Sequence, residues 1–156
     1  MIGAGSLGGS RLRRSDHSRR GDMLNPQAAL IYGMVLVSAV DTEMSDSELR
    51  MIGDLVRTLP VFRDFDLDDL PAVASACAGL LEKDDGAEEA MALIDASLPP
   101  RLKATAYALA CDVAAADGEL KQEELRLLEI MRHSLKIDRL TAAALERGTS
   151  ARFATV

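Results

Sequence analysis

Residues 28–61 read AALIYGMVLVSAVDTEMSDSELRMIGDLVRTLPV, and residues 104–137 repeat this pattern 76 positions later as ATAYALACDVAAADGELKQEELRLLEIMRHSLKI. The two stretches align without a gap and are identical at nine of 34 positions. Each contains an apolar run, a short acidic segment and a second run with apolar residues at helical spacing. The repeat therefore predicts the same helix-loop-helix unit twice.

The composition favours a helical core. Apolar residues make up 48 % of the 156 residues but aromatic residues only 3 %, and Ala, Leu, Val, Ile and Met suit closely packed helices. We predict one all-α domain of about seven helices, with apolar central helices over residues 26–40 and 100–116. A capping box at Ser45 and Glu48 begins the helix after the first, and Gly148 is expected to end the last helix, over 139–147.

The charge is distributed unevenly along the chain. Residues 1–22 carry five Arg and two Asp, a net charge of +3. The whole chain carries −7, so residues 23–156 carry −10. An acidic domain repels nucleic acid and anionic membranes and favours cations or basic partners. We predict a disordered basic tail over 1–22 and a helical domain over 23–156, with Met23 as an alternative start.

Two patterns in the first 40 residues imitate known signals. The glycines at positions 3, 5 and 8 resemble a dinucleotide-binding loop but lack the strand that should precede it. Ser18-Arg19-Arg20 and the following apolar run resemble a twin-arginine export signal, yet cleavage would remove one helix of the repeat. The run is also too short to span a bilayer. We therefore expect a cytoplasmic protein without direct membrane insertion.

The most distinctive polar residues are acids that recur in both units. A carboxylate at the end of a helix meets the negative end of the helix dipole, and a divalent cation would offset the charge because hard ions take carboxylate oxygens. The candidate ligands are Asp41, Glu43, Glu48, Asp117, Glu119 and Glu124. Calcium, magnesium, manganese and zinc are the cations considered. Asp112 is either a further member of this acidic group or a paired structural acid.

A simpler interpretation needs no metal. Glu48 is explained by the capping box, and Arg50 and Arg126 could pair with the acids. The glycine and the final glutamate of an EF-hand loop are missing from both units. Cys77 and Cys111 lie in apolar surroundings and are expected to be buried. With two histidines in the chain, no catalytic arrangement can be built, and we expect a protein that is not an enzyme.

The segment Ala114-Ala115-Ala116-Asp117-Gly118-Glu119-Leu120, followed by Glu124, resembles the tellurite-resistance TerB-like family. The resemblance covers about 25–148, and the motif recurs in weaker form at 39–43. It implies about seven helices and a non-enzymatic bacterial stress protein, with acidic clusters linked to divalent cations and a surface for protein partners, including membrane-associated ones. The family motif carries over to Asp41, Glu48, Asp117 and Glu124, whereas Glu43 and Glu119 rest on the repeat.

Two departures from the family pattern concern the acidic loops. Thr42 replaces the turn glycine in the first unit, and Lys121 places a cation beside the second. The favoured hypothesis is a cytoplasmic, cation-responsive stress protein. The alternative is a metal-independent helical adaptor whose acids bind basic partner proteins.

Overall fold

The computed structural model describes residues 23–40, 44–118 and 120–156, and these ranges hold seven α-helices and no strand. The all-α prediction is therefore confirmed. The helices are α2 (Pro26–Ser38), α3 (Asp46–Thr58), α4 (Leu70–Leu81), α5 (Gly86–Ser97), α6 (Pro100–Ala114), α7 (Gln122–Ser134) and α8 (Arg139–Arg152). Short 3₁₀ turns, Pro60–Phe62 and Leu67–Asp69, lie between α3 and α4. The predicted tail, 1–22, lies outside the described residues.

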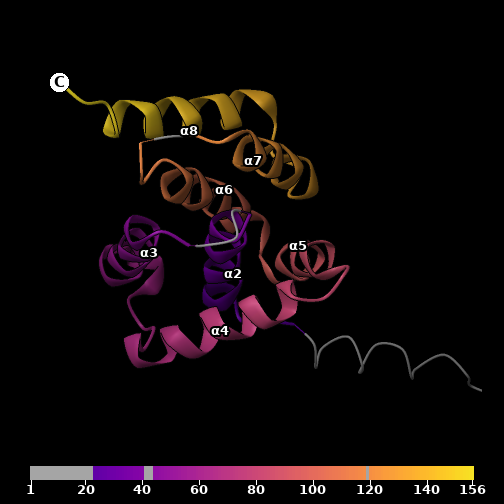
Figure 1. Cartoon of the computed structure of the whole chain (residues 1–156). Coiled ribbons are helices and arrows are strands. Elements are labelled where there is room, and N and C mark those ends of the chain that lie inside the picture. Colours follow the sequence, from indigo (N-terminus) through magenta and orange to yellow (C-terminus); the bar gives the residue numbers. More distant parts are fainter. Residues whose placement is uncertain (1–22, 41–43, 119) are drawn as a thin grey trace, which may run out of the picture.

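Helix α2 is the centre of the molecule. All of residues 28–38 are buried, because the segment is apolar on every side. Figure 1 shows α3 and α5 on either side of α2, α4 across one end and α6 across the other. Helix α6 in turn lies between α2 and α8. The two helices predicted to be central thus form the contact around which the others pack.

The helix boundaries follow local signals in the sequence. The side chain of Asn25 accepts a hydrogen bond from the amide of Ala28 at 2.8 Å, and Pro26 occupies the first turn of α2. Helix α5 begins at Gly86, where a Cβ atom would lie 2.1 Å from the carbonyl oxygen of Leu80. Only glycine fits this close approach of α5 to the end of α4.

The same spacing separates three pairs of helix ends. Ser38 and Ala114, Asp46 and Gln122, and Thr58 and Ser134 are each 76 residues apart. The two units therefore place their helix ends, and the acids beside them, at equivalent points along the chain.

The predicted end of the last helix at Gly148 is wrong. Helix α8 continues to Arg152, and Gly148 lies inside it. The hydroxyl of Thr149 donates to Oδ1 of Asp112 at 2.7 Å, and Arg152 pairs with the same carboxylate. These contacts with α6 extend the helix past a residue that disfavours helix by about 1 kcal/mol.

Both cysteines belong to the core, as predicted. Cys77 and Cys111 are 0 % and 4 % exposed and are not joined in a disulfide. Burial raises the pKa of each thiol to about 12, so both remain protonated at neutral pH. In the described ranges, no helix is both long and apolar enough to cross a bilayer.

Candidate functional site

Two buried glutamates occupy the third position of α3 and of α7. Glu48 is 4 % exposed and Glu124 is 1 % exposed. Each carboxylate turns back toward the start of its helix. There Oε2 of Glu48 accepts from the amide of Ser45 at 2.8 Å, and Oε2 of Glu124 accepts from the amide of Lys121 at 3.0 Å. The capping role predicted for Glu48 is confirmed. Glu124 accepts the equivalent hydrogen bond at the start of α7.

The residue before each helix makes the two sites different. The hydroxyl of Ser45 accepts a hydrogen bond from the amide of Glu48 at 3.2 Å, which completes a reciprocal capping box. Lys121 occupies the equivalent position of the second unit, and an ammonium group has no acceptor to offer. Lys121 therefore cannot give the start of α7 the side-chain acceptor that Ser45 gives the start of α3.

The electrostatics of Glu124 show that the acids of the two units are near each other. Burial is the main cause that raises the pKa of Glu124, and the carboxylates of Asp117 and Glu48 raise it further. The hydrogen bond from the backbone of Lys121 opposes this rise only in part. Because α3 and α7 both pack against the α2–α6 pair, one acid from the first unit and two from the second lie in one neighbourhood. The sequence predicted the acids but not this approach.

The other candidate acids lie on α6, in the turn after it, or outside the described residues. Asp117 is exposed in the turn after α6, where Gly118 has a φ of 81° that favours glycine. Asp112 is paired with Thr149 and Arg152, as expected for the structural alternative given above. Asp41, Glu43 and Glu119 lie outside the described residues.

The chemistry of this acidic neighbourhood suits a hard cation or a basic side chain. Carboxylate oxygens are preferred ligands of calcium and magnesium. Within 23–40, 44–118 and 120–156, no three His, Cys, Asp or Glu side chains are grouped as a ready metal site. Glu48 and Glu124, with the exposed Asp117, are therefore acids of one neighbourhood that are not grouped as such a site. The other three predicted ligands lie outside the described residues.

The structure also contains a cavity beside α7 that the sequence did not predict. It lies between α6, α7 and α8 and has a volume of about 660 Å³. Its lining includes Tyr107, Glu146 and Arg132, which come from three different helices. The proximity of these three residues could not be predicted from the sequence, because it depends on how α8 covers α6.

Comparison with known proteins identifies a family that this chain matches. The family model described as tellurite resistance protein TerB matches residues 27–147. No curated protein and no solved structure matches the chain. The matched range begins within α2 and ends within α8. It includes both buried glutamates and most of the cavity lining, but not Thr149, Ser150 and Phe153.

Proposed function

Since this chain belongs to the TerB family of tellurite-resistance proteins, we propose that it is a non-enzymatic stress-response protein whose acidic neighbourhood binds a divalent cation. The observation that supports this most directly is the raised pKa of Glu124, which is buried and lies close to the charges of Asp117 and Glu48. Like charges held together in a poorly solvated place destabilise the folded state. A bound cation would remove that cost and stabilise the fold.

The proposed cation would connect the two units. Glu48 begins α3 and Glu124 begins α7, and each uses one carboxylate oxygen for the backbone of its own helix. A cation beside them would interact with the starts of both helices at once. We expect calcium, magnesium, manganese or zinc to fill this role. The protein would then act in the cytoplasm through other proteins, including membrane-associated ones, in response to the cation.

The alternative function is an adaptor that needs no metal. Leu49 and Leu125 directly follow the two buried glutamates and are 53 % and 43 % exposed. An exposed apolar residue next to buried acids could contact an Arg- or Lys-rich partner, with its cations taking the place of the metal. This alternative also agrees with the charge of −10 over residues 23–156.

Calorimetric titration and thermal unfolding test the cation proposal. The chelator-treated protein is titrated with each of the four cations, beside Glu124→Gln, Glu48→Gln and Asp117→Asn. Glu123→Gln is the matched control, because Glu123 lies in the same helical turn and is exposed. We expect a bound cation to raise the free energy of unfolding of the wild type and of Glu123→Gln by RT ln(1 + [L]/Kd). This stabilisation should be absent from Glu124→Gln.

The outcomes separate the two functions. If no cation raises the melting temperature of the wild type above its value in chelator, the metal proposal is wrong and the adaptor remains. If Glu123→Gln loses the effect as fully as Glu124→Gln, the cation is held by the general surface charge. Zinc is included last because it also binds unfolded cysteines, which reduces its stabilising effect.

A further inference from the structure

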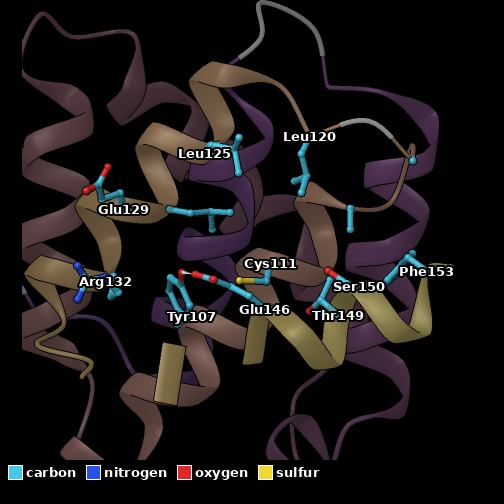
Figure 2. A pocket seen from close by; sticks show the side chains of 13 residues that line it. Tyr107, Cys111, Leu120, Leu125, Glu129, Arg132, Glu146, Thr149, Ser150 and Phe153 are labelled. Atoms are coloured by element: carbon cyan, nitrogen blue, oxygen red, sulfur yellow. Dashed lines mark hydrogen bonds between the residues drawn. The ribbon is translucent and has the colours of Figure 1, made fainter. Parts of the chain in front are cut away.

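The cavity between α6, α7 and α8 is partly open to solvent and has the size of a small-molecule site. Figure 2 shows its lining side chains, with α7 on one side and α8 on the other. Its volume of about 660 Å³ lies within the range typical of ligand pockets, about 300–1,000 Å³. Tyr107, Cys111 and Leu128 form a buried floor, and none of the three is more than 6 % exposed.

One part of the cavity wall is apolar and open to solvent. Leu120 and Leu125 line the cavity and are 49 % and 43 % exposed. The partly exposed Phe153 continues this wall, and Leu128 of the floor lies next to it. Apolar side chains exposed around a concave surface are typical of sites that bury the apolar part of a ligand.

The polar part of the cavity contains an exposed carboxylate, that of Glu146, which one hydrogen bond orients. The hydroxyl of Tyr107 donates a hydrogen bond of 2.5 Å to Oε1 of Glu146, which joins the floor to α8 (Figure 2). Burial is the main cause that raises the pKa of Tyr107, and the hydrogen bond to Glu146 raises it further, so the phenol remains a donor. One oxygen of Glu146 is thereby held in place, while the second can accept from a ligand.

The charges around the cavity favour a cationic head over an anionic one. Glu129 and Glu146 contribute two carboxylates, against the single guanidinium of Arg132. That guanidinium is also engaged elsewhere, because it contacts the carbonyl of Ile137 at 3.4 Å and the ring of His133 at 3.0 Å. A protonated amine would therefore meet a net negative charge, and a carboxylate would meet repulsion from two acids.

We propose that this cavity binds a small amphiphile, with a protonated amine on Glu146 and an apolar body against Leu120, Leu125, Leu128 and Phe153. Tyr107 positions the carboxylate that receives the amine. The cavity is distinct from the buried glutamates, so the proposal stands with or without a bound cation and is tested in the presence of chelator.

The test is calorimetric titration with n-octylamine, kept below the concentration at which it aggregates. Sodium octanoate and n-octanol share its tail and differ in the head, and methylamine shares the head without the tail. We expect n-octylamine to bind about tenfold more tightly than octanoate, because a hydrogen bond to a charged group contributes about 1.4 kcal/mol or more. Methylamine should show no saturable binding.

Four variants locate the site. Glu146→Gln should weaken n-octylamine about tenfold, and Leu125→Ser should weaken it severalfold. The matched controls are Glu89→Gln on α5 and Leu140→Ser, since Glu89 is exposed, Leu140 is 82 % exposed and neither lines the cavity. Both controls should bind as the wild type does. If Glu146→Gln and Leu125→Ser also bind as the wild type does, the amine lies elsewhere and the proposal is wrong.

Amide chemical shifts of the wild type give a second measurement that needs no variant. Bound n-octylamine should move the amide signals of Gly118, Leu125, Leu128 and Ser150, which line the cavity, and leave those of α4 unchanged. Shifts confined to α4 and α5 would overturn the proposal. Tighter binding of octanoate than of n-octylamine would also overturn it, because Arg132 would then select the head.

Discussion

The two helix-loop-helix units have the same helix ends but different surroundings. In the first unit, α2 is buried on all sides and α3 begins with a complete capping box at Ser45. In the second unit, α6 is covered on its far side by α8, and α7 begins with Lys121, whose side chain cannot accept the hydrogen bond. The first unit therefore has a reciprocal capping box that Lys121 cannot complete in the second.

This difference shows where a repeated sequence can acquire a function. Glu48 and Glu124 have the same place in their helices, yet in the second unit Lys121 cannot complete the capping box and a cavity adjoins the helix. We therefore expect substitutions at equivalent positions to have unequal effects. Three matched sets measure this inequality, and a fourth concerns the attachment of α8 to α6.

The largest effect is expected from truncation of the core residue on each second helix. Ile52 on α3 and Leu128 on α7 are equivalent in the repeat and are 4 % and 6 % exposed. Ile52→Ala should lower the free energy of unfolding by about 2–5 kcal/mol. Leu128→Ala should fall in the lower part of this range, because Leu128 already borders a cavity that water can enter. Urea unfolding measures the free energy of unfolding of both variants. A larger loss for Leu128→Ala than for Ile52→Ala would contradict the expected difference between the two units.

The next effect concerns the two caps. Ser45→Ala removes the hydroxyl that accepts from Glu48 and should cost about 0.5–2 kcal/mol. Lys121→Ala removes an exposed charge but no cap acceptor, so it should cost less than Ser45→Ala. Thermal unfolding in the presence of chelator measures the loss of stability in each variant. Equal losses would show that Lys121 supports α7 as strongly as Ser45 supports α3.

A smaller effect, of opposite sign, is expected at the buried glutamates. The folded-state pKa of Glu124 is raised, so the protonated carboxyl stabilises the fold below its unfolded pKa and this stabilisation is lost as the pH rises through the folded pKa. Glu124→Gln should therefore be more stable than the wild type at pH 7 in chelator. The gain should vanish as the pH falls below the usual carboxyl range, near pH 4.

Two further variants complete this set. Glu48→Gln removes a charge next to Glu124 but leaves Glu124 buried, and burial is the main cause of the shift, so its gain should be smaller. Glu123→Gln is exposed and should show no gain. Unfolding curves over a range of pH values provide the measurement. A loss of stability in Glu124→Gln at pH 7 would show that the charged form is the stabilising one.

The smallest effect is expected where α8 is attached to α6. The side chain of Arg152 is 57 % exposed, so Arg152→Ala should cost no more than about 1 kcal/mol. Thr149→Ala removes the other partner of Asp112 from a buried position and should cost more than Arg152→Ala. A larger loss for Arg152→Ala in thermal unfolding would mean that the ion pair, not the hydroxyl, holds Asp112.

Local features of the fold could be predicted from the sequence, and approaches between distant segments could not. The helix starts at Asn25 and Ser45 were predictable because capping depends on residues three or four positions apart. The partners of Asp112 lie 37 and 40 residues away, and this distance explains why Gly148 was mistaken for a helix end. The neighbourhood of Glu48 and Glu124 likewise depends on packing around α2. The repeat predicted the acids but not that Glu48 and Glu124 would lie in one neighbourhood.

The central position of α2 determines how the molecule can open. Helix α2 packs against α3, α4, α5, α6 and α7, whereas α8 packs mainly on α6. An amide in the middle of α2 can therefore exchange with solvent only when the whole domain unfolds, while α8 can detach in a smaller, more frequent opening. Hydrogen exchange should thus be slowest in α2 and faster in α8. The cavity lies beside the helix that leaves first, so a ligand can enter it without disturbing the core.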